Sequence, residues 1–209
     1  MKILILGHGM LGRAFPPEIE RVPERMRDFN VLKNYISARR PDYLINCAGL
    51  TGEHNCENTY ETYVSNVCLP LYLAKICNEC SADLVQFSTF YCGDGNYTMS
   101  KRIMEESFEA IGQPIIYLPT LFDERLRIAH YLEQCHLGYS VDVADWVMDN
   151  LGADDTFLAN KGFPTRQDFV EYTGEEYNPM MRGTPVNEST TEITYMRHWK
   201  EAVDEIRTF

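Results

Sequence analysis

The chain has 209 residues, of which 44% are hydrophobic and 24% are charged, a balance typical of a soluble globular protein with a full hydrophobic core. The 31 acidic residues against 19 basic ones give a net charge of −12, which argues against a surface for nucleic acid or for an anionic membrane. No apolar run approaches the roughly 20 residues that span a bilayer. The seven cysteines, odd in number and without a secretory signal, indicate reduced thiols in a cytoplasmic protein.

Predicted strands and helices alternate from residue 1 to about residue 122. Residues 2–6 form a continuous apolar run, typical of a parallel strand that is buried on both faces. A glycine loop and a first helix follow, and the helix should stop before Pro16 and Pro17. The other elements expected here are helices over 31–38, 60–80 (interrupted at Pro70) and 97–111, and strands over 42–49, 84–88 and 115–118. This alternation predicts an α/β protein with a Rossmann-type, doubly wound parallel sheet.

The segment Gly7-His8-Gly9-Met10-Leu11-Gly12 directly follows the first predicted strand and opens a helix. In this context the motif G-x-G-x-x-G binds a dinucleotide. The first glycine permits the tight turn, the second lets a pyrophosphate approach the backbone, and the third allows close packing between helix and strand. The sequence therefore predicts a site for NADP(H) or NAD(H).

The choice between the two cofactors depends on residues about 20 positions after the loop. Glu20 and Glu24 could bind the ribose hydroxyls of NAD(H), whereas Arg21, Arg25 and Arg27 could neutralise the 2′-phosphate of NADP(H). The pattern leans slightly to NADP(H), and NAD(H) stays open.

Tyr97 and Lys101 are four residues apart, so a helix places both side chains on one face. A nearby ammonium group lowers the pKa of a phenol, which allows it to exchange protons near neutrality. Thr89, in preference to Ser88, would hydrogen-bond a substrate oxygen. This group indicates a ketone/alcohol oxidoreductase, and no metal site is expected.

The pattern loosens after residue 122. It predicts helices over 141–151, 165–173 (with Thr165 as N-cap) and 199–207, one strand over 156–159, and a loop over 178–194. We therefore expect an NAD(P)-binding Rossmann domain over residues 1–122 and a small, reduced substrate-binding lobe over residues 123–209.

Several motifs resemble the extended short-chain dehydrogenase/reductases, and within them the dTDP-4-dehydrorhamnose reductase branch of nucleotide-sugar enzymes. Residues 88–95 resemble the motif S-T-D-Y-V-F-D-G of that branch, and residues 97–105 resemble Y-G-x-[ST]-K-x-x-G-E. Residues 41–49 resemble P-D-V-V-V-N-A-A-A. Asp28-Phe29 matches the acid and apolar residue that flank the adenine, and Asn66 matches an asparagine in the helix before the Ser/Thr strand.

The resemblance implies NAD(P)H-dependent reduction, or epimerisation, of a nucleotide-linked 4-keto sugar. Thr89 would orient the keto oxygen, Tyr97 would donate the proton, and Lys101 would hold the nicotinamide ribose. The resemblance also suggests a homodimer. The residues expected to contact the cofactor are Gly7, Gly9, Met10, Leu11, Gly12, Asp28, Phe29, Ala48, Gly49, Leu50, Asn66 and Lys101.

Substrate contacts are expected at the carboxyl ends of the strands, where ligands bind in sheets of this kind. The residues predicted there are Phe90, Tyr91, Thr120 and Phe122. The chain is shorter than members of the resembled family, both between Thr89 and Tyr97 and after residue 122. This shortening leaves a second interpretation open, in which the chain is a non-catalytic dinucleotide-binding or regulatory protein of the same fold.

Overall fold

The structure is a computed structural model that describes residues 1–24, 28–52, 55–90, 93–126, 136–162, 164–174 and 192–208. The strands are β1 (Ile3–Leu6), β2 (Glu20–Arg21), β3 (Tyr43–Asn46), β4 (Asp83–Thr89), β5 (Ile116–Leu118), β6 (Thr120–Phe122), β7 (Leu137–Tyr139), β8 (Thr156–Lys161) and β9 (Ile193–His198). The helices are α1 (Met10–Ala14), α2 (Phe29–Arg39), α3 (Thr59–Tyr63), α4 (Leu69–Cys80), α5 (Asn96–Ile111), α6 (Ser140–Asp149), α7 (Arg166–Thr173) and α8 (Trp199–Thr208), with a π-helical turn at Val64–Cys68.

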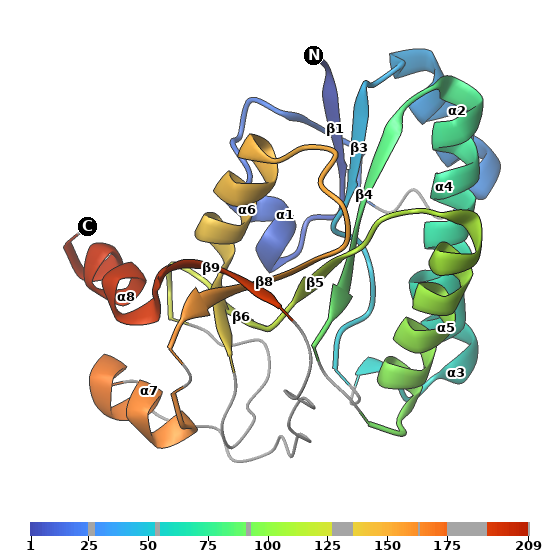
Figure 1. Ribbon diagram of the computed structural model, residues 1–209. Helices are drawn as coiled ribbons and strands as arrows, with labels where there is room; N and C mark the ends of the chain where they lie inside the picture. Colours follow the sequence, from blue (N-terminus) through green and yellow to red (C-terminus); the bar gives the residue numbers. More distant parts are fainter. Residues whose placement is uncertain are drawn as a thin grey trace.

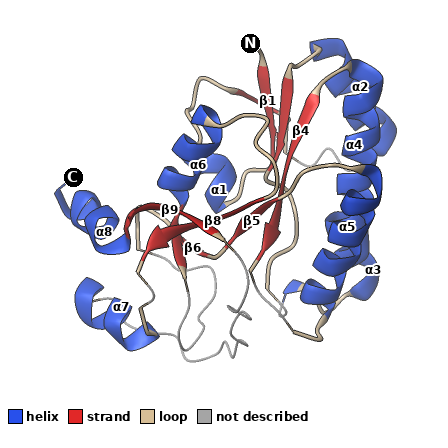
Figure 2. Cartoon of the chain, viewed as in Figure 1, coloured by secondary structure: helices blue, strands red, loops and turns tan. Residues whose placement is uncertain are grey.

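Within these described ranges, seven strands form one parallel sheet in the order β2-β1-β3-β4-β5-β8-β9. Helices α2, α4 and α5 cover one face of the sheet, and α1 and α6 cover the other (Figure 1). Figure 2 shows the same arrangement as a layer of strands between two layers of helices. The connections between parallel strands place helices on both faces of the sheet, so its strands are buried on both faces. The Rossmann-type fold predicted from the sequence is confirmed.

The side chains of β1 show why its apolar run is continuous. Ile3 and Ile5 pack into the core on the side of α1 and α6, whereas Leu4 and Leu6 pack into the core on the side of α2, α4 and α5. Successive strand side chains point to opposite faces, so a strand between two helical layers needs apolar residues at every position.

Two predicted helix ends are confirmed by the structure. Helix α1 ends at Ala14, two residues before Pro16, because the residue that precedes a proline disfavours the helical conformation. Before α7, the Thr165 hydroxyl accepts a hydrogen bond from the backbone N–H of Asp168, and the Asp168 carboxylate accepts one from the Thr165 N–H. This reciprocal pair is a capping box, which satisfies backbone N–H groups that have no partner inside the helix.

The predicted interruption at Pro70 is wrong. Helix α3, the π-helical turn and α4 follow one another without a break, and Pro70 lies in the first turn of α4. Proline lacks an N–H and clashes with the carbonyl four residues before it. Here the Leu69 N–H bonds to the carbonyl of Val64, five residues back, so the wider turn accommodates the proline ring.

The segment after residue 122 contributes to the same sheet as the segment before it. β8 and β9 extend the sheet beyond β5, and α6 packs against residues of α1. β9 begins at Ile193, so the predicted loop over 178–194 is wrong at its end, and the part up to residue 191 lies outside the described residues. The division at residue 122 stays a prediction, and both of its parts supply strands to one sheet.

A third apolar core lies beside the sheet, under α7 and α8. Phe122 and Tyr139 stack in it with ring centroids 5.2 Å apart, and Phe169 and Trp199 pack around them. Phe122 comes from β6 and Tyr139 from β7, which pair with each other in a second, small sheet.

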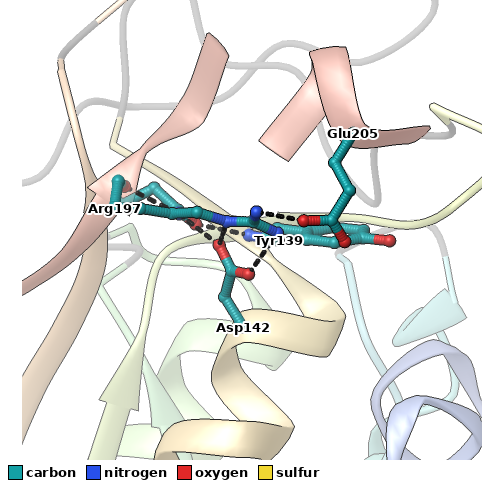
Figure 3. A network of polar contacts seen from close by, with 5 residues as sticks. Tyr139, Asp142, Arg197 and Glu205 are labelled. Carbon is teal, nitrogen blue, oxygen red and sulfur yellow. Dashed lines mark hydrogen bonds and ion pairs between the residues drawn. The ribbon is translucent and has the colours of Figure 1, made fainter. Parts of the chain in front are cut away.

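A polar network joins this region to the main sheet (Figure 3). Arg197 is an extra residue in β9, since Asn160 pairs with the residue before it and Lys161 with the residue after it. Such a bulge redirects a side chain, and the Arg197 guanidinium bonds to the carboxylate of Asp142 at 2.7 and 3.0 Å and to that of Glu205. These two carboxylates raise the pKa of Arg197.

Asn160 stands at the centre of the network and is fully buried. Its amide nitrogen donates to the carboxylate of Asp142 (2.6 Å) and to the carbonyl of Arg197 (2.9 Å), and its amide oxygen accepts from the N–H of Tyr139 (2.7 Å). One side chain therefore connects β7, α6, β8 and β9.

Asn160→Ala is expected to lower the free energy of unfolding by about 2–4 kcal/mol, because it removes three hydrogen bonds and leaves buried backbone groups without them. Urea unfolding of the wild type and the variant measures this loss. The matched control is Asn34→Ala, at an exposed position within α2, where a change below about 0.5 kcal/mol is expected. An equally small effect at Asn160 would contradict the assigned role.

Candidate functional site

The glycine loop connects β1 to α1, and its three glycines have different surroundings. Gly7 has φ +109°, and a Cβ on it would lie 2.5 Å from the carbonyl carbon of Cys47. A Cβ on Gly12 would lie 2.2 Å from the carbonyl oxygen of Gly7. In contrast, a Cβ on Gly9 would meet no heavy atom within 4 Å. Gly7 and Gly12 are thus required by packing, whereas the space above Gly9 is open to a ligand.

Met10 and Leu11 form the first turn of α1, directly after Gly9. The first N–H groups of a helix have no acceptor inside the helix, so the backbone of this turn offers donors to an anion. Leu11 is buried in the core, and Met10 is partly exposed.

The loop after β3 lies at the same edge of the sheet, since β1 and β3 are parallel neighbours. Asn66 fixes this loop: its amide oxygen accepts from the Leu50 N–H (2.9 Å), and its amide nitrogen donates to the Leu50 carbonyl (3.0 Å) and to the Ser100 hydroxyl of α5 (3.1 Å). A Cβ on Gly49 would lie 3.2 Å from the Asn66 amide oxygen. Ala48, Gly49 and Leu50 are therefore held between the sheet and α5.

Asp28 and Phe29 lie at the start of α2. The Asp28 carboxylate accepts from the N–H groups of Asn30 and Val31 and caps the helix. The Phe29 ring stacks on Tyr72 of α4, with centroids 4.8 Å apart. The start of α2 thus presents a carboxylate that caps the helix and an aromatic ring that packs on α4.

The structure gives Arg21 a packing role. Its guanidinium donates to the carbonyls of Gly12, Phe15 and Ile19, among others, and so satisfies the end of α1. Arg25 and Arg27 lie outside the described residues.

The two candidate acids differ in their partners. The Glu20 carboxylate pairs with Arg39 and accepts from the Tyr35 hydroxyl. Glu24 lies 3.8 Å from the Nδ1 atom of His8, whose Nε2–H donates to the Val22 carbonyl (2.7 Å). His8 thus ties the glycine loop to the chain after β2, where Glu24 lies.

Tyr97 and Lys101 occupy the first two turns of α5. Tyr97 is buried. The Lys101 ammonium donates to the carbonyl of Phe87 in β4 at 3.3 Å. Burial lowers the pKa of Lys101 to about 8, while Glu105 and Cys56 act in the opposite direction. Thr89 is the last residue of β4, so the structure brings Tyr97, Lys101 and Thr89 to the edge of the sheet at which the glycine loop lies.

The residues predicted to contact the substrate differ in how far they are exposed. Phe90 is 4% exposed and packs against the rings of His136 and Phe157. Phe122 is fully buried in the third core and has no surface to offer a ligand. Thr120 is partly exposed, and Tyr91 lies outside the described residues.

Glu105 is a residue to which the sequence assigned no role, although it matched a family motif. In the structure its carboxylate accepts a hydrogen bond from the Ser88 hydroxyl. Ser88 is therefore buried and engaged inside the protein, whereas Thr89 at the end of β4 is partly exposed.

No helix within the described residues is both long enough and apolar enough to cross a membrane.

A parallel sheet with helices on both faces and a glycine loop after its first strand define a Rossmann-type α/β protein, which also carries a Tyr-Lys pair on the helix after β4. Residues 1–110 match the family model of the RmlD substrate binding domain, and the chain belongs to that family.

Solved structures have the same fold. The chain is similar to dTDP-4-dehydrorhamnose reductase from Bacillus anthracis in complex with NADP (17% identity, TM-score 0.74, covering 100% of this chain and 98% of that one). It is also similar to a dTDP-4-dehydrorhamnose reductase from Clostridium acetobutylicum (20% identity, TM-score 0.74, covering 100% of this chain and 99% of that one). A third similar structure is the Bordetella bronchiseptica enzyme WbmG in complex with NAD and UDP (14% identity, TM-score 0.73, covering 100% of this chain and 94% of that one). No curated protein sequence matches the chain. At these identities the structural matches establish the fold, including the part after residue 122.

Lys101→Met tests the burial of the ammonium group. The ordinary pKa of a lysine is 10.5 and that of Lys101 is about 8, so between these pH values residue 101 binds more protons in the unfolded chain than in the folded one, and its contribution to stability rises with pH. The variant lacks this gain. We therefore subtract the unfolding free energy of the variant from that of the wild type. From about pH 7 to about pH 10, this difference is expected to increase by about 1–3 kcal/mol. Urea unfolding at both pH values measures it, and a difference independent of pH would contradict the burial.

Proposed function

We propose that the chain is an NAD(P)H-dependent reductase, or epimerase, of a nucleotide-linked 4-keto sugar. The observation that carries this proposal is the position of Tyr97 and Lys101 at the start of α5, with Lys101 docked on the Phe87 carbonyl of β4. β4 ends at the same edge of the sheet as the glycine loop, because β1, β3 and β4 are parallel neighbours. The similar structures that contain NADP, or NAD and UDP, support the classes of cofactor and substrate.

The residues around the glycine loop fit a dinucleotide. The open space above Gly9 admits a pyrophosphate close to the backbone, and the first turn of α1 presents N–H groups to it. Asp28 and Phe29 would contact the adenosine, and Lys101 would hold the nicotinamide ribose. The loop that Asn66 fixes (Ala48, Gly49 and Leu50) would line the cofactor. When bound, the reduced nicotinamide supplies a hydride.

Tyr97 would supply the proton that the ketone oxygen takes up as the carbonyl carbon is reduced. The positive charge of Lys101, one helical turn away, favours the phenolate that remains. Thr89 would donate a hydrogen bond to the keto oxygen and orient it. An epimerase would use the same residues in both directions, with Tyr97 first accepting and then returning the proton.

The substrate would lie beyond the carboxyl ends of β4 and β6. Thr120, which is partly exposed, is the proposed contact from β6. Phe90 would form the wall behind the substrate rather than a binding surface, since it is buried.

A homodimer and a cytoplasmic location are also part of this proposal. Light scattering of the purified protein would test the dimer. The mass of two chains is expected, and the mass of one chain would contradict the proposal.

Gly9→Ala is expected to weaken NADPH or NADH binding about 10-fold, because the added methyl group fills the space proposed for the pyrophosphate. Nucleotide fluorescence titrations with each cofactor measure this loss and show which cofactor the wild type prefers. The fold should stay intact, since Gly9 has φ −73° and its Cβ meets no atom within 4 Å. Unchanged binding would contradict the proposed cofactor site.

Gly12→Ala is the matched comparison for Gly9→Ala. Its Cβ would lie 2.2 Å from a backbone oxygen, so it should lower the stability of the fold itself. Thermal unfolding of both variants separates loss of a ligand site from loss of structure.

Tyr97→Phe is expected to keep cofactor binding and to lower turnover of a 4-keto nucleotide sugar by about 10²-fold or more, the usual contribution of a general acid. Steady-state oxidation of the reduced cofactor measures the rate. The control is Tyr60→Phe, at a position that is 78% exposed on α3, which should leave turnover unchanged. Equal turnover in Tyr97→Phe and the wild type would refute the role of Tyr97, and a wild type that binds cofactor without turnover would favour the regulatory interpretation.

A further inference from the structure

Two consecutive residues of β4 contact two residues that lie one turn apart on α5. The Phe87 carbonyl accepts a hydrogen bond from the Lys101 ammonium at 3.3 Å. The next residue, Ser88, donates its hydroxyl hydrogen to the carboxylate of Glu105. An ammonium group and a carboxylate thus lie on the same face of α5, both directed at β4.

Few charged groups face this pair from the elements around it. Within the described part of the chain, the groups that act on Lys101 are Glu105 on its own helix and the buried thiol of Cys56 in the loop before α3. Asn96 holds that loop to the start of α5 by donating to the Cys56 carbonyl at 2.8 Å. Glu105 is therefore the carboxylate that faces Lys101.

The surroundings of Glu105 are mixed. On α5 it is next to Lys101, Arg102 and Glu106, and the phenol of Tyr117 faces it from β5. Burial raises the pKa of Glu105, while the hydroxyl of Ser88 and the ammonium of Lys101 lower it. Both of these partners thus favour the ionised carboxylate.

We propose that Glu105 is a positioning residue whose carboxylate, fixed by the Ser88 hydroxyl, keeps the Lys101 ammonium charged and in place one helical turn from Tyr97. This inference rests on the function proposed above for Tyr97 and Lys101. Glu105 acts through Lys101 and does not itself touch substrate or cofactor.

The physical reason is the cost of burying a charge. An ammonium group that is removed from water loses its proton more readily, and a nearby carboxylate opposes this loss. A neutral Lys101 would no longer favour the phenolate of Tyr97. Ser88 matters because a carboxylate without a hydrogen-bond donor would itself tend to take up a proton when buried.

The test is a pH titration of the Lys101 side chain by NMR in the cofactor-free protein, with the Lys101 signal assigned from its absence in Lys101→Met. Glu105→Gln removes the charge but still accepts a hydrogen bond from Ser88. The wild-type midpoint is expected at about 8, and the Glu105→Gln midpoint about 1 unit lower. The matched control is Glu106→Gln, an exposed carboxylate on the next position of the same helix, for which no change is expected.

An unchanged Lys101 midpoint in folded Glu105→Gln would overturn the proposal and leave Glu105 only a packing role. If Glu105→Gln does not fold, Ser88→Ala carries the test, because it keeps the carboxylate and removes its donor. The midpoint should then fall in the same direction by a smaller amount, and no change would again refute the proposal.

The pH dependence of kcat provides the second measurement. In Glu105→Gln the loss of rate at high pH should begin at lower pH, with KM for the sugar nearly unchanged, since Glu105 does not contact it. A wild type that turns over no 4-keto nucleotide sugar would refute the proposed function, whereas the NMR titration would still decide the role of Glu105.

Discussion

The close approach of three backbone segments at the ends of β1 and β3 determines the geometry of the whole candidate site. Gly7 and Gly12 leave no room for a side chain between the glycine loop, α1 and Cys47, so the ends of the two strands are fixed relative to the first turn of α1. The loop after β3 continues from this contact to Leu50, where Asn66 holds it and also bonds to Ser100 of α5. The positions of Tyr97 and Lys101 relative to the glycine loop follow from this series of contacts.

Three polar side chains with several partners each fix the backbone in other parts of the molecule. Arg21 satisfies carbonyls at the end of α1, Asn66 holds a loop, and Asn160 joins four elements. Buried backbone groups must be hydrogen-bonded, and these three side chains supply such bonds where the chain is not in a regular ladder.

The sequence predicted the parallel sheet because buried strands and helix periodicity leave strong local signals, as in residues 2–6. It did not predict the strand Ile193–His198, which is short, follows a segment rich in Pro, Gly, Thr and Asn, and pairs with a strand that is non-local in sequence. Tyr97 and Lys101 were identifiable because a helix brings residues four apart together. Ser88 and Glu105 meet across two elements, and Phe122 is covered by residues remote in sequence. Neither arrangement leaves a mark in local spacing, so these placements needed the structure.

The order of the strands also has a consequence for how the protein is made. β8 lies between β5 and β9, and β9 is separated from it in sequence by residues 162–192. During synthesis β8 emerges well before its neighbour, and its edge then presents unpaired N–H and C=O groups beside the apolar side chains of Leu158 and Ala159. Until β9 pairs with β8, this edge of the sheet is open to pairing with the strand of another chain, and once β9 has paired it becomes the edge strand itself.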